Sequence, residues 1–113
     1  MEPEIWLKRF KTVFLHCMAD PDCTAEVLAQ RMHTSRTVLY RRVKSWSGLT
    51  LREFCENLRL ERARELLESG EKFKIRALAL RVGYRDALRF SRKFRARYGM
   101  YPSECLSRKQ EHV

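Results

Sequence analysis

Apolar residues recur at intervals of three and four along most of this chain, with polar and charged residues between them. Residues at these intervals share one face of an α-helix, so the pattern predicts helices that each bury one side. The predicted helices cover residues 3–19, 25–32, 36–47, 51–68, 75–82, 87–98 and 103–106. Because the chain has no long alternating run of β-branched residues, the pattern indicates an all-α fold of seven helices.

One structural plan occurs twice along the chain. Residues 35–48 and 86–99 each contain a helix-capping side chain, two apolar positions four apart, two cations and a glycine that ends the helix. A helix that follows a turn and carries cations on its outer face is the element with which a helix-turn-helix reads DNA. The repeat therefore predicts two helix-turn-helix units in one chain.

The segment between the two units is expected to be a stiff helix. Thr50 and Glu53 have the spacing of a capping box, in which each side chain bonds an otherwise unpaired amide. The helix that they begin would be roughly 27 Å long at 1.5 Å per residue. We therefore expect a first helix-turn-helix subdomain over residues 1–49, a linker helix over 50–69, and over 70–113 a second subdomain with a short C-terminal helix and a polar tail.

The distribution of charge along the chain indicates what kind of partner it binds. Lys and Arg number 24 against 14 Asp and Glu, which gives a net charge of +10. Residues 72–98 contain ten cations and one acid, and residues 31–44 contain five cations and no acid. Positive charge concentrated on the two repeats is typical of proteins that bind the phosphate backbone of nucleic acids. The alternative is a basic surface that only keeps the protein in solution.

Other function classes find little support in the sequence. The four cysteines lack a C-x-x-C spacing and no secretory signal precedes them, so we expect buried, inert thiols with no disulfide and no metal site. No apolar stretch is long enough to span a membrane, and a cytoplasmic location is expected. Paired catalytic groups and a phosphate-cradling glycine loop are also missing, which predicts a protein that is not an enzyme and needs no cofactor.

Several motifs carry a family resemblance. They are Leu28-Ala29, Arg59-Leu60-x-x-Ala63-x-x-Leu66-Leu67 and Ile75-x-x-Leu78-Ala79-x-x-Val82-Gly83-Tyr84-x-Asp86. In order and spacing, the chain from about residue 13 to 107 resembles the AraC/XylS family of bacterial transcription regulators. The resemblance implies two homeodomain-like helix-turn-helix subdomains joined by a helix, with recognition helices in adjacent major grooves. The chain departs from the family at His33, where glycine is frequent, and at Lys74 and Tyr101, where a capping Ser or Thr is common.

Candidate DNA-contacting residues lie on the outer faces of the two predicted recognition helices. On the first helix they are Arg36, Thr37, Tyr40, Arg41 and Lys44, and on the second they are Arg85, Leu88, Arg89, Ser91, Arg92 and Lys93. The resemblance implies base reading by the positions of Thr37, Tyr40, Arg41, Ala87, Leu88, Arg89, Ser91 and Arg92. An arginine fork can pair with guanine O6 and N7, whereas Lys44 is expected to anchor a phosphate.

Three of these residues have structural alternatives. Tyr40 can be a partly buried aromatic at the rim of the core, because its ring is apolar. Leu88 can pack in the core, and Arg92 can form a salt bridge between helices.

The sequence thus predicts a sequence-specific, double-stranded-DNA-binding transcription regulator. The alternative is a sequence-tolerant RNA-binding or nucleoid-associated protein that depends on charge alone. Contact with RNA polymerase is a further expectation from the family. Most family members carry an additional sensor domain, so the chain is either a self-standing monomer or the C-terminal part of a larger, dimeric regulator.

Overall fold

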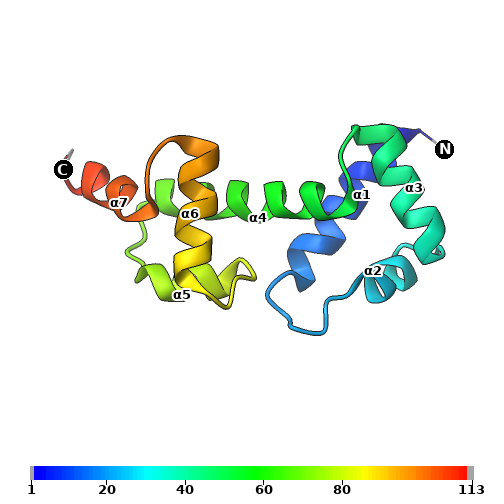
Figure 1. The fold of residues 1–113 in the computed structure, drawn as a ribbon, viewed down its shortest axis with the longest axis horizontal. Helices are drawn as coiled ribbons and strands as arrows, with labels where there is room; N and C mark the ends of the chain where they lie inside the picture. Colours follow the sequence, from blue (N-terminus) through cyan, green and yellow to red (C-terminus); the bar gives the residue numbers. More distant parts are fainter. Residues whose placement is uncertain (1, 112–113) are drawn as a thin grey trace. The chain divides into compact units, whose positions relative to one another are not determined.

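The computed structural model describes residues 2–111 of the chain, with side chains from residue 2 to 106, and this part contains seven helices and no strand. The all-α prediction is confirmed. The helices are α1 (Pro3–Cys17), α2 (Ala25–Arg31), α3 (Arg36–Ser47), α4 (Leu51–Glu68), α5 (Ile75–Arg81), α6 (Ala87–Tyr98) and α7 (Pro102–Glu111), labelled in Figure 1.

Three of the predicted helices, α3, α4 and α6, have the predicted bounds, and two others differ clearly. Helix α1 ends at Cys17 instead of residue 19, because the Asp20 amide donates to the Cys17 carbonyl (3.0 Å) and turns the chain. Helix α7 continues to Glu111 instead of ending at residue 106, so the predicted end of this helix is wrong. No Gly or Pro follows Pro102 to end this helix.

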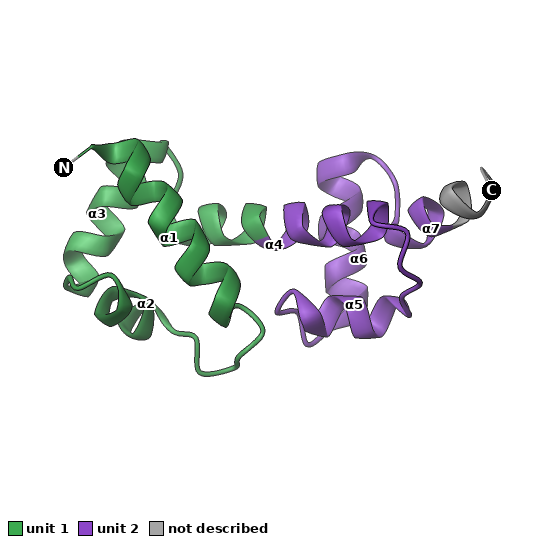
Figure 2. Cartoon of the chain, turned by 180° about the vertical axis from the view of Figure 1, so that it is seen from behind, with its two compact units in different colours: residues 1–58 green, residues 59–113 purple. Residues whose placement is uncertain are grey.

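The helices form two compact units, Met1–Leu58 and Arg59–Val113, coloured separately in Figure 2. The boundary falls inside α4, and buried side chains occur on both sides of it. Before the boundary these are Leu51, Cys55 and Leu58, and after it they are Leu60, Ala63, Leu66 and Leu67. Helix α4 therefore supplies core residues along its whole length.

The first unit has an aromatic core. Phe10, Phe14, Leu39 and Val43 are almost completely buried. The ring of Phe10 lies 5.7 Å from that of Phe54 and 6.4 Å from that of Phe14, which joins α1 to α4. Burial of side chains this large, at roughly 1.5–3 kcal/mol each, is the main stabilising contribution to such a unit.

The second unit is built in the same way. Leu78, Val82, Phe90 and Phe94 are fully buried, and the ring of Tyr84 lies 5.4 Å from that of Phe90. The inner faces of α5 and α6 therefore meet in one apolar cluster, and their opposite faces are left in solvent.

Side-chain caps fix where several helices begin. The hydroxyl of Ser35 accepts from the Val38 amide (3.2 Å), and the carboxylate of Asp86 accepts from the Arg89 amide (3.2 Å). The predicted capping box at α4 is also present, because the Thr50 amide donates to Glu53 Oε1 and the Glu53 amide donates to Thr50 Oγ1, both at 3.1 Å. Hydrogen bonds to the Glu53 carboxylate from the side chain and the backbone amide of Thr50 are the main reason that the pKa of Glu53 lies below its usual value.

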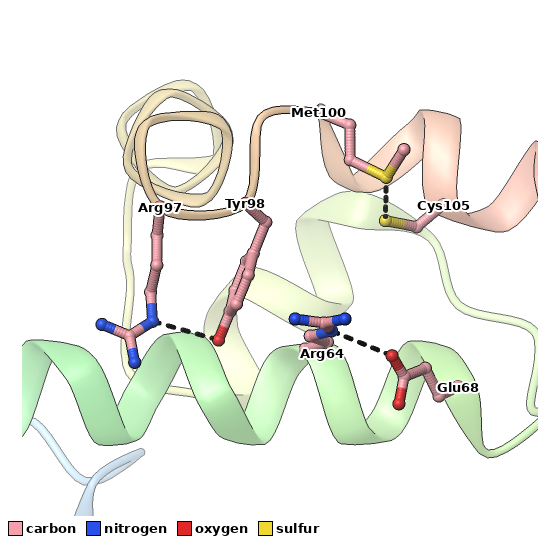
Figure 3. Close-up of polar contacts among 6 residues, drawn as sticks. All are labelled: Arg64, Glu68, Arg97, Tyr98, Met100 and Cys105. Carbon is pink, nitrogen blue, oxygen red and sulfur yellow. Dashed lines mark hydrogen bonds and ion pairs between the residues drawn. The ribbon is translucent and has the colours of Figure 1, made fainter.

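The cysteines only partly match the expectation. Cys17 and Cys55 are buried, whereas Cys23 and Cys105 are half-buried, and none of the four forms a disulfide. Cys105 Sγ lies 3.1 Å from Met100 Sδ, a contact drawn in Figure 3. In the described part of the chain, no helix could cross a membrane, and no group of side chains is suited to holding a metal ion.

Candidate nucleic-acid interface

Each unit contains a helix-turn-helix, and the two turns differ in length. In the first, the Thr34 amide donates to the Ala29 carbonyl at 2.9 Å, and in the second, the Tyr84 amide donates to the Ala79 carbonyl at 2.8 Å. These pairs are 50 residues apart, whereas the capping residues that follow, Ser35 and Asp86, are 51 apart. The second turn therefore has one additional residue, Arg85, whose side chain is exposed.

Both turns need a residue with a positive φ. Gly83 supplies it in the second turn with φ 97°. In the first turn His33 adopts φ 56°, the left-handed conformation that glycine adopts more easily. The turn therefore forms although His33 replaces the glycine that is frequent in the family, and the histidine adopts a backbone conformation that is less favourable for it than for glycine.

The outer face of α3 exposes every candidate residue of the first unit. Arg36, Thr37, Tyr40, Arg41 and Lys44 are exposed, whereas Leu39 and Val43 between them are buried. Tyr40 is 45% exposed, so its ring is accessible to a partner.

One of these residues has a second role that its sequence position did not indicate. Lys44 Nζ donates to the Gly48 carbonyl at 3.1 Å, which supports the C-terminal end of α3. The same ammonium group also contributes to the lowered pKa of Glu53.

The candidates of the second unit are less uniform. Arg85, Leu88, Arg89 and Arg92 are exposed, whereas Ser91 and Lys93 are half-buried. Leu88 is 57% exposed, so it does not pack in the core as the alternative held. Arg92 is exposed and forms no ion pair with any residue whose side chain is described, so the described chain gives no support to its alternative role as a salt bridge between helices.

Other cations of the second unit are engaged within the protein. Arg97 Nη2 lies 2.9 Å from Glu61 Oε1, and its Nε donates to the Tyr98 hydroxyl at 3.2 Å. The guanidinium of Arg64 lies 4.8 Å from the centroid of the Tyr98 ring. Figure 3 shows Arg97 and Tyr98 extending from the end of α6 toward α4, where Arg64 pairs with Glu68. That pairing raises the pKa of Arg64.

Several cations of the second unit thus have partners within the protein, which counting charges along the sequence does not reveal. Arg81 also lies near Glu71 (3.8 Å), and Arg95 donates to the Tyr101 hydroxyl (3.1 Å). An aromatic or acidic residue at helical spacing from a cation was the signal that could have identified some of these pairs, such as Arg64 and Glu68.

Comparison with known proteins agrees with this geometry. A family model described as a helix-turn-helix domain matches residues 28–108. The chain is 31% identical over 111 residues to a histidine kinase P4 of Formosa agariphila, a match that covers 98% of this chain and 8% of that protein. It is 34% identical over 79 residues to the HTH-type transcriptional activator RhaS of Escherichia fergusonii, covering 70% of this chain and 28% of that protein.

A solved structure resembles the fold along almost the whole chain. It is the DNA-binding domain of the global transcriptional factor AdpA in complex with a target DNA, with a TM-score of 0.78 and 24% identity over 94% of each chain. The chain thus spans most of this domain but less than a third of the length of the two relatives.

Proposed function

Because this chain belongs to the AraC family of helix-turn-helix transcription regulators, we propose that it recognises one duplex site with two recognition helices, α3 and α6, in successive major grooves. The matched family model is that of a helix-turn-helix domain, RhaS is a transcriptional activator, and the match to the histidine kinase covers only 8% of that protein.

The observation that carries the proposal is the shared construction of α3 and α6. Each has 12 residues, follows a turn, starts at a side-chain cap and ends at a glycine with a left-handed backbone. Each buries two apolar residues and exposes an arginine at an equivalent position, Arg41 and Arg92. A major groove admits a helix of this kind with its polar face toward the base edges.

The exposed side chains suggest different roles in such a complex. Arg41, Arg89 and Arg92 have the fork that pairs with guanine, and Leu88 and the methyl of Thr37 can contact thymine methyls. Arg36 and Arg85 lie at the starts of the two helices, where a cation can meet a phosphate. Ser91 and Lys93 are half-buried, so their side chains extend less far from the protein. We assign them contacts with the sugar-phosphate backbone of the DNA.

The location, the oligomeric state and the contact with RNA polymerase are proposed from the family alone. We propose that the chain acts in the bacterial cytoplasm, binds its site as a monomer, and contacts RNA polymerase there. Since its matched relatives are several times longer, it can also act as the DNA-binding part of a larger regulator.

A selection from random duplexes, followed by titration of the selected site against random DNA, tests the proposal. We expect a specificity ratio of ~10³ or more. The logarithm of the binding constant should fall against the logarithm of salt with a slope of about −4 to −8, if roughly five to nine phosphates are neutralised. A steep slope without any preference for sequence would instead identify a charge-driven nucleoid or RNA-binding protein.

A further inference from the structure

Arg42 follows Arg41 on α3 but lies on a different side of the helix. Arg41 is exposed, whereas Arg42 is half-buried. The guanidinium carbon of Arg42 lies 5.7 Å from the ring centroid of Trp6 on α1 and 5.6 Å from that of Trp46 on α3. Successive residues of a helix are about 100° apart, so the two arginines cannot both face one groove.

The two tryptophans beside Arg42 contact each other, and one of them lies in the core. Trp6 is buried and stacks on Phe10 with ring centroids 5.7 Å apart and planes 12° from parallel. The rings of Trp6 and Trp46 meet edge to face at 5.4 Å. Tryptophan is the best aromatic partner of a cation, and a planar guanidinium packs on its ring more closely than an ammonium does. The Trp6–Arg42–Trp46 cluster therefore joins α3 to α1 by a contact that favours one rotation of α3.

We propose that Arg42 is a positioning residue of the first recognition helix, which sets the rotation of α3 on α1 and so aims Arg41 at the base edges without itself contacting DNA. This inference rests on the proposed function of α3. It also gives α1, which lies outside the matched residues 28–108, a part in DNA recognition. The sequence alone placed Arg42 among the five cations counted over residues 31–44.

The experiment compares Arg42→Gln with Arg36→Gln, an exposed arginine on the same helix whose replacement changes the net charge equally. We expect Arg42→Gln to weaken binding to the selected duplex about tenfold or more and to lower the specificity ratio, with the salt slope unchanged. Arg36→Gln, which removes a proposed phosphate contact, should instead reduce the slope by about 0.9 and weaken all duplexes equally. The same behaviour in Arg42→Gln would identify Arg42 as a phosphate contact.

Tryptophan emission gives an independent reading of the cluster. The chain has two tryptophans, and both contact Arg42. Arg42→Gln should therefore shift the emission of the free protein, whereas Arg36→Gln should leave it unchanged. Arg42→Lys keeps a cation over the rings and should recover part of the specificity.

The outcomes separate the inference from the function on which it rests. If Arg42→Gln fails to fold, Trp46→Phe retains an aromatic ring with a weaker attraction for the cation, and it should lower specificity with the same slope. The role proposed for Arg42 is overturned if these variants show a reduced salt slope. It is also overturned if they keep the full specificity ratio of a wild type that prefers the selected duplex. A wild type with no preferred duplex contradicts the proposed function instead.

Discussion

Arg97 and Glu61 form an ion pair between the last turn of α6 and the middle of α4, with Arg97 Nη2 2.9 Å from Glu61 Oε1. Their side chains are 32% and 41% exposed, so the pair lies at the surface of the second unit. It is one of the contacts that join α6 to α4.

A double-mutant cycle with Arg97→Gln and Glu61→Gln should give a coupling energy of about 0.2–1 kcal/mol, because water screens a pair this exposed. Urea unfolding of the four proteins measures it. The coupling energy should be smaller still at high salt, because salt screens exposed charges. A coupling several times larger would mean that the pair is shielded from solvent in the folded protein.

Phe90→Ala should destabilise the second unit by about 3–5 kcal/mol, because it leaves a cavity where a fully buried ring now packs. Binding to DNA should be lost with it, since Arg89 and Arg92 flank Phe90. The matched control is Leu88→Ala on the same helix, which should change stability by less than about 0.5 kcal/mol because Leu88 is exposed. Equal stability changes in the two variants would contradict the position of α6 described above.

Arg41→Ala and Arg89→Ala should each cost about 1–3 kcal/mol on the selected duplex and relax the preference at one or two base pairs. Lys44→Ala should weaken all sequences about equally, because a phosphate contact carries no sequence information. Its stability must be measured in parallel, since Lys44 also donates to the Gly48 carbonyl. The same uniform loss in Arg41→Ala would make Arg41 a phosphate contact.

Inserting five base pairs between the two half-sites should reduce binding to that of a single unit. Helix α4 is one unbroken helix of 18 residues, without Gly or Pro in its interior. Major grooves on one face of a duplex recur every 10–10.5 base pairs, and a half-turn insertion moves the second groove to the opposite face. Gel-shift titration of the two duplexes checks this, and tight binding to both would show that the units do not act in tandem.

The capping box of α4 should make stability depend on pH in the acid range. The bonds from Thr50 lower the pKa of Glu53, so the folded state favours the charged carboxylate. This contribution is complete above the unfolded pKa, about 4.3, and is lost as pH falls through the lower folded value. The difference in melting temperature between the wild type and Thr50→Ala should therefore become smaller as the pH falls below about 4, and the difference that remains reflects the bond from the Glu53 amide to Thr50 Oγ1, which does not titrate. A constant difference down to pH 2 would show that the Glu53 carboxylate does not take part.

The sequence by itself determined the helices, most of their ends and both cores. Ser35, Asp86 and the pair of Thr50 and Glu53 act on amides three residues away or fewer, and the apolar spacing that buries Leu39 and Phe90 is a property of one helix. Such features are local, so the order of residues is sufficient to predict them.

Only the tertiary structure decided which cations remain available to a partner. Arg41 and Arg42 are adjacent and chemically identical, yet one is exposed and the other lies against Trp6 from a distant helix. In the same way Arg97 is paired with Glu61, whereas Arg92 is not paired within the described chain. The physical reason is that a guanidinium takes its partner from whatever side chain packing brings within a few ångströms, and some of these partners, such as Trp6 and Glu61, come from residues far apart in sequence.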